Sequence, residues 1–152
     1  MLEQKQGYSL PEKSTLWIGA NIGAGILVIT VIIRFIGGII FAGFVAENKI
    51  LNVALGIILL LIGIWLGTMF GIRYVVKRSQ INLEKINNIS IVAATIPFIF
   101  FLLWMIIDLY IAFAGKEKFV LDINWLIGTI LSAIVAFFFV RHSLRKFVKL
   151  HI

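Results

Sequence analysis

The chain has 152 residues, of which 61% are hydrophobic and 14% are charged, with a net charge of +7 and a mean hydropathy of +1.07. A soluble domain carries about 45–50% apolar and about 25% charged residues, so this composition excludes an ordinary water-soluble domain. The absence of cysteine excludes disulfides, thiolate metal sites and thiol nucleophiles.

Four apolar segments are long enough to cross a bilayer, whose hydrocarbon core needs about 20 helical residues. They cover 16–46, 50–72, 89–114 and 120–140, and short connectors separate them. Short connectors favour antiparallel neighbours, so the sequence predicts an all-α membrane protein, an up-down bundle of four transmembrane helices. A segment 1–15 precedes this bundle and a basic tail, 141–152, follows it.

The first apolar segment, 16–46, is too long for the apolar region of a signal peptide. As a single helix it would be about 46 Å long, which exceeds the thickness of the hydrocarbon core of a bilayer. The sequence therefore predicts a strongly tilted helix, a protruding end, or a break near Gly37 and Gly38.

A stripe of small residues runs along one face of the second segment. Its glycines Gly63, Gly67 and Gly71 recur every fourth residue, and residues with this spacing share one face of a helix. Such faces allow two backbones to approach closely, and Gly19 and Gly23 lie at matching depth on the first segment. The sequence predicts a tight contact between these two helices, with a homodimer as the alternative use of the glycine face. The predicted packing positions are Gly19, Gly23, Gly56, Gly63, Gly67, Gly71 and Gly128.

Two charged residues lie deep within the apolar segments, Arg34 in the first and Asp108 in the third. A charge at the bilayer centre costs at least about 2.5–3.5 kcal/mol, so such residues pair with one another or serve a function. Both lie about 27–28 Å along helices that run the same way, which predicts an Arg34–Asp108 ion pair. Asn52 and Asn124 complete the predicted polar cluster, which faces outward.

The cations are distributed unevenly among the connectors. Ten of the 14 Lys and Arg residues lie in 1–15, 73–88 and the tail, and three lie in the other two connectors. The positive-inside rule then predicts a multi-pass protein of the inner or plasma membrane with both termini cytoplasmic. These cations cluster at helix ends, which favours a bilayer partner with anionic lipids on the cytoplasmic side over nucleic acid. The tail residues predicted to contact those lipids are Arg141, Arg145, Lys146 and Lys149.

Enzyme motifs are absent: the chain has no H-E-x-x-H, no P-loop and no G-x-S-x-G. We therefore expect no enzymatic activity, no cofactor and no metal. The first interpretation is an accessory or assembly subunit of a larger membrane complex, locked internally by Arg34 and Asp108. The alternative is a small transporter or flippase that binds an anionic substrate or lipid headgroup in the outward-facing polar cluster.

Overall fold

The computed structural model describes residues 11–45, 49–115 and 123–150. Four long helices make up most of this part of the chain, and a single 3-10 turn, η1 (Leu83–Lys85), precedes the third. Each long helix contains a stretch long and apolar enough to cross a membrane, and no strand occurs among the described residues. The four helices are α1 (Thr15–Val45), α2 (Lys49–Val76), α3 (Ile86–Ala114) and α4 (Ile123–Leu150).

The first helix is continuous. It runs through Gly37 and Gly38 without interruption, so the break considered at these glycines is absent. The β-branched and aromatic side chains around these glycines are poorly solvated by water but fit hydrocarbon. The hydrogen bonds of the helix satisfy its backbone throughout.

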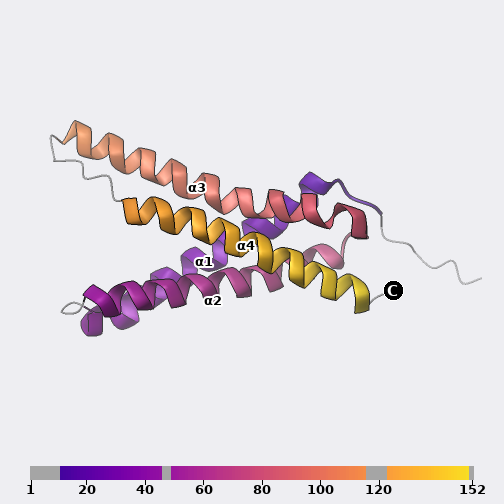
Figure 1. Cartoon of the computed structure of the whole chain (residues 1–152), viewed down its shortest axis with the longest axis horizontal. Helices are drawn as coiled ribbons and strands as arrows, with labels where there is room; N and C mark the ends of the chain where they lie inside the picture. The colour runs from indigo at the N-terminus through magenta and orange to yellow at the C-terminus, as the bar shows by residue number, and fades with distance from the viewer. Residues whose placement is uncertain (1–10, 46–48, 116–122, 151–152) are drawn as a thin grey trace, which may run out of the picture.

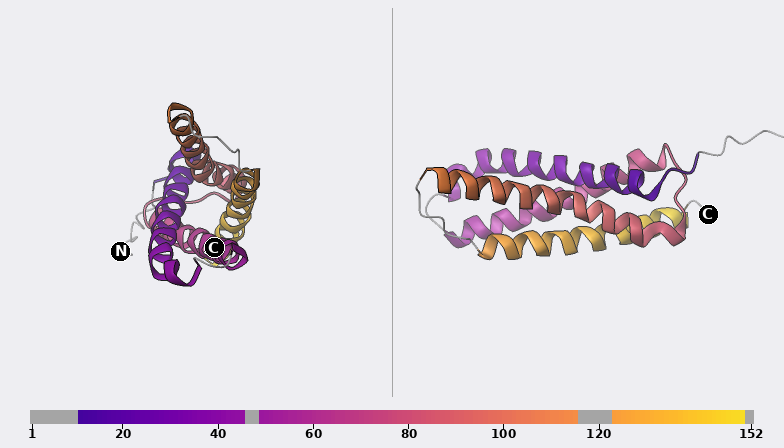
Figure 2. Two further views of the ribbon diagram at one scale, coloured as in Figure 1. Left: turned by 90° about the vertical axis from the view of Figure 1, so that its left-hand side faces the viewer. Right: turned by 90° about the horizontal axis from the view of Figure 1, so that it is seen from above.

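The helices form a four-cornered arrangement in which each contacts two others (Figures 1 and 2). The interfaces are α1–α2, α1–α3, α3–α4 and α2–α4, and the last is the smallest. We call the end at which α1 begins and α4 finishes the terminal end, and the other the opposite end. Towards the opposite end the α3–α4 pair diverges from the α1–α2 pair (Figure 1).

The buried core occupies the half of the bundle near the terminal end. On α1 the buried apolar side chains stop at Ile26, and on α4 they begin at Ala136. Beyond these positions large apolar side chains are exposed, including Phe35, Ile39 and Phe113, which suits contact with hydrocarbon. The fully buried larger apolar side chains are Ile18, Ile22, Ile26, Ile72, Val75, Ile86, Ile89, Val140 and Leu144.

Glycines of α2 bring its backbone against that of α1. A Cβ on Gly67 would lie 2.5 Å from the Cα of Ile26, and one on Gly71 would lie 2.8 Å from the Cα of Ile22. One on Gly63 would lie 2.8 Å from the Cα of Thr30. The contacts ascend α1 as they descend α2, so the two helices are antiparallel. This face of α2 is covered by α1 of the same chain.

The glycine partners on α1 differ from the prediction. Gly19 and Gly23 face α3, where added Cβ atoms would lie 2.6 Å from the Cβ of Val92 and 2.7 Å from the carbonyl oxygen of Ala93. The α1 glycines that meet α2 are Gly25, whose added Cβ would lie 3.1 Å from the carbonyl oxygen of Gly67, and Gly37, which packs against the side chain of Leu59. Two residues correspond to about 200° around a helix, so Gly23 and Gly25 lie on opposite sides. α1 therefore passes between α2 and α3, with a small residue on each side.

The segment before α1 is attached to the connection between α2 and α3. The backbone N–H of Lys13 donates to the Oγ of Ser79 at 3.0 Å, and Lys85 forms an ion pair with Glu12. Ser79 is buried, whereas the ion pair is largely exposed. The terminal end is thus closed by both packing and polar contacts.

Candidate pocket in the opposite half of the bundle

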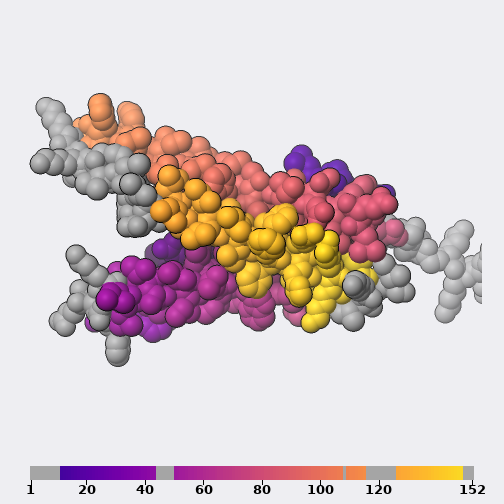
Figure 3. All heavy atoms as spheres, viewed as in Figure 1, coloured from indigo at the N-terminus to yellow at the C-terminus, as the bar shows by residue number. Residues whose placement is uncertain are grey.

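A pocket of about 340 Å³ lies where the two helix pairs diverge. All four helices contribute to it, with most of its lining from α2 and α4. Figure 3 shows the corresponding notch between α4 and α2 at the opposite end. Pockets of about 300–1,000 Å³ are typical of small-ligand sites, so this one is large enough for a small polar group.

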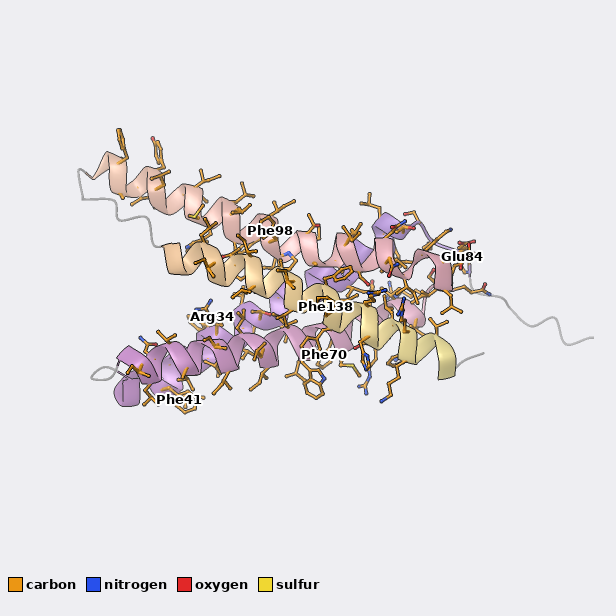
Figure 4. All side chains as sticks on the ribbon, in the orientation of Figure 1. Arg34, Phe41, Phe70, Glu84, Phe98 and Phe138 are labelled. Atoms are coloured by element: carbon orange, nitrogen blue, oxygen red, sulfur yellow. The ribbon has the colours of Figure 1, made fainter. Side chains whose placement is uncertain are left out.

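Arg34 enters this pocket from α1. It continues a stripe in which every fourth residue is buried, namely Ile22, Ile26 and Thr30, and it is the first member of that stripe to be exposed. The change occurs because the helices that cover the earlier members diverge at this level. Figure 4 shows the side chain between the α1–α2 pair and α4. The guanidinium group therefore faces the pocket and not a packed core.

Three further polar side chains line the pocket: Asn52 on α2, and Thr129 and Ser132 on α4. The Ser132 hydroxyl donates to the carbonyl oxygen of Thr129 at 2.8 Å, so its proton is engaged by its own helix. Asn52 is exposed and its amide supplies two N–H donors. Arg34 and Asn52 are thus the principal donors to a pocket occupant.

Gly56 and Gly128, which the sequence predicts as packing positions, line this pocket. Among the described residues, a Cβ at either position would have no heavy atom within 4 Å. Gly56 lies seven residues, or about two turns, before Gly63, so it shares the face of the α2 glycines that pack on α1, but no described atom of α1 lies within 4 Å of a Cβ placed on it. Apolar side chains complete the lining: Val53, Ile57, Leu60 and Phe101.

The predicted polar cluster is assembled in part. Arg34 and Asn52 line one pocket, while the side chains of Asp108 and Asn124 lie outside the described residues. The predicted ion pair therefore stays a prediction. The contacts of Gly19 and Gly23 set the register of α1 against α3. If this register is extended along both helices, the backbone of Asp108 lies within about one turn of the level of Arg34. The sequence analysis does not predict the α4 contribution of Thr129 and Ser132, although it singles out the neighbouring Gly128.

The pocket carries a net positive charge among the described lining residues. Arg34 is the charged residue in this described lining, which contains no acidic side chain. A guanidinium group has five N–H donors in a planar fork, which matches the oxygens of a carboxylate or a phosphate. In the low dielectric of a membrane the attraction between this group and an anion is stronger than in water. The pocket is therefore suited to an anion with oxygen acceptors.

A second hollow, of about 460 Å³, lies between α3 and α4 and is almost entirely apolar. Its polar member is Thr95, whose hydroxyl donates to the carbonyl oxygen of Ile91 at 2.8 Å. With that donor engaged, this hollow offers packing surface without a group that would select a ligand.

The predicted lipid-contacting cations lie along the terminal half of α4. Arg145 and Lys146 are exposed, and the side chain of Lys149 lies outside the described residues. Arg141 is only half-buried, and its Nε is buried with no hydrogen-bond partner among the described residues. It follows the core residue Val140, which explains why part of its side chain points inward.

Comparison with known proteins adds no relative: no protein-family model, no curated protein and no solved structure matches this chain.

Proposed function

We propose that this protein is a non-enzymatic, multi-pass membrane protein that binds an anionic substrate or headgroup in the pocket beside Arg34. The observation that carries the proposal is an exposed guanidinium within a pocket that has an amide donor and no carboxylate among its described lining residues. Of the two functions considered from the sequence, this favours the transporter or flippase class.

The proposed threading is up-down, with both termini cytoplasmic and the pocket towards the outer leaflet. Four helices able to cross a membrane and the excess of cations at the terminal end support it. A periplasmic or extracellular reporter, such as alkaline phosphatase, fused after Ile152 is expected to be inactive, whereas a fluorescent reporter at the same position is expected to fold. An active phosphatase fusion would overturn this threading.

The proposed role of Arg34 follows from the energy of its position. An unpaired charge in the bilayer costs at least about 2.5–3.5 kcal/mol, and an anionic ligand in the pocket would offset that cost. Catalysis is not proposed, because the pocket has no nucleophile next to a base among its described residues. The Ser132 proton is donated to a carbonyl group, and both histidines of the chain lie in its last twelve residues.

The second candidate is an accessory or assembly subunit in which Arg34 and Asp108 form an internal lock. The α1–α3 register favours it, since the two residues lie at similar levels. A buried ion pair is weak evidence for stability, yet removing one partner is strongly destabilising.

Charge exchange distinguishes the two functions. A lock predicts that Arg34→Asp and Asp108→Arg each reduce the amount of folded protein and that the double variant restores it. Ligand binding predicts that Arg34→Gln folds at a normal level, loses anion binding, and is not rescued by any change at Asp108. The proposed function would be refuted if the double variant restored the amount of folded protein and Arg34→Gln still bound the anion as the wild type does.

A further inference from the structure

We infer that the ligand of this pocket is the phosphodiester headgroup of a monoanionic phospholipid, which enters sideways between α2 and α4. The inference rests on the proposed function and specifies its substrate class. It is carried by three features of the described residues: the charge of the pocket, its size, and the thin interface at which it lies.

The charge selects a monoanion. Arg34 supplies one positive charge and the described lining supplies no second cation. A phosphodiester carries a single negative charge and two unesterified oxygens, which a guanidinium binds through paired N–H donors. A phosphomonoester at neutral pH carries up to two negative charges and would retain an unbalanced charge in a low-dielectric site. The Asn52 amide supplies donors for an ester oxygen or a headgroup hydroxyl.

The size separates the headgroup from the tails. The pocket of about 340 Å³ is near the lower limit of ligand sites, so it holds a headgroup but not a diacyl lipid. The tails of a bound lipid must therefore leave the pocket through an apolar opening. Val53 and Ile57 provide such an edge, since they line the pocket and are themselves 63% and 52% exposed.

The opening is the seam between α2 and α4. This is the smallest of the four helix interfaces, and most of the pocket lining comes from these two helices. Gly56 and Gly128 leave space here within the described part of the chain, because an added Cβ at either would have no described heavy atom within 4 Å. The tightly packed α1–α2 glycine face offers no comparable path. A headgroup thus reaches Arg34 through the seam while its tails remain among the surrounding acyl chains.

Four probes test the ligand, using the purified full chain in detergent and thermal unfolding as the readout. Dioleoyl phosphatidylglycerol supplies the diester and the tails, dioleoyl phosphatidylcholine supplies the tails with a zwitterionic headgroup, glycerophosphoglycerol supplies the diester without tails, and inorganic phosphate supplies the free anion. We expect saturable stabilisation by phosphatidylglycerol, with at least about tenfold weaker binding of the other three. Equal stabilisation by glycerophosphoglycerol or phosphate would overturn the lipid inference while leaving anion binding intact.

Variants test the site. Arg34→Gln is expected to weaken phosphatidylglycerol binding by at least about tenfold, and Arg34→Lys to weaken it less. Gly128→Leu is expected to fill the pocket and abolish binding, since no described residue packs against Gly128. Gly38→Leu is its matched control, because Gly38 also lacks a described neighbour within 4 Å of an added Cβ but does not line the pocket. If Arg34→Gln fails to fold, the glycine pair still decides the question. Unchanged binding in Gly128→Leu would overturn the pocket as the site, and unchanged binding in folded Arg34→Gln would overturn the proposed function as well.

A cysteine at the seam provides an independent readout. The chain has no cysteine, so Gly128→Cys introduces its sole thiol. We expect phosphatidylglycerol in a phosphatidylcholine nanodisc to slow maleimide labelling of this thiol by at least about tenfold, and the Arg34→Gln background to remove that protection. Protection that persists in this background would contradict headgroup binding at Arg34.

Discussion

Alanine substitutions at Gly67 and Gly56 are expected to have opposite effects on stability, although both residues lie on one face of α2. They are eleven residues apart, which is close to three full turns of the helix. At Gly67 an added Cβ would lie 2.5 Å from the Cα of Ile26 and 2.8 Å from the carbonyl oxygen of Gly25. At Gly56 it would meet no heavy atom of the described residues within 4 Å. The first position is closed by the α1 backbone and the second opens into the pocket.

The magnitude follows from these distances. Non-bonded carbon atoms rest about 3.5–4.0 Å apart, so Gly67→Ala requires α1 and α2 to separate by about 1 Å locally. Overpacking of this kind costs about 1–3 kcal/mol. Replacing glycine by alanine in a helix also gains about 0.5–1 kcal/mol at either position. That gain cancels in the comparison, so Gly67→Ala is expected to be about 1–3 kcal/mol less stable than Gly56→Ala, which itself equals or exceeds the wild type.

The assay is reversible unfolding in mixed micelles at increasing mole fractions of sodium dodecyl sulfate, followed by tryptophan fluorescence. The chain has four tryptophans, of which Trp65 lies on α2 itself, and neither substitution removes one. Equal stabilities of the two variants would refute the reasoning, because they would mean that α1 does not pack closely on α2 at Gly67.

Three further predictions use the same titration. Gly23→Ala is expected to lose about 1–3 kcal/mol, since its Cβ would lie 2.7 Å from a carbonyl oxygen of α3, while Gly38→Ala is expected to lose nothing; equal losses would contradict the assigned α1–α3 contact. Thr68→Val is expected to be neutral or stabilising by up to about 1 kcal/mol, because the Thr68 hydroxyl is buried without a partner among the described residues. A loss of more than about 1 kcal/mol in the free energy of unfolding would indicate that this hydroxyl forms a hydrogen bond. Glu12→Gln breaks the exposed ion pair with Lys85 and is expected to cost less than about 1 kcal/mol, with a smaller effect still at high salt; a larger loss would show that the terminal end depends on this pair.

The pocket could be predicted from the sequence only in its parts. Arg34 and Asn52 stand out as polar residues in apolar helices, and helical spacing put Arg34 on an interior face. The sequence predicts Gly128 of the α4 wall as a packing position, because a small residue that lets a helix approach and one that leaves a cavity look alike in the sequence. The difference depends on whether another helix is present at that level, which the sequence of one helix does not state.

The sequence by itself determined that the chain forms four long apolar helices, since 20 or more consecutive apolar residues fit hydrocarbon and satisfy their backbone only as a helix. It also determined which residues share a helix face, because that depends only on the periodicity of the helix. The tertiary structure alone decided which neighbour each face meets: Gly25 packs on α2, Gly19 and Gly23 pack on α3, and Gly56 faces a pocket. The physical reason is that these pairings depend on the positions and divergence of whole helices, which are set jointly by contacts on all four.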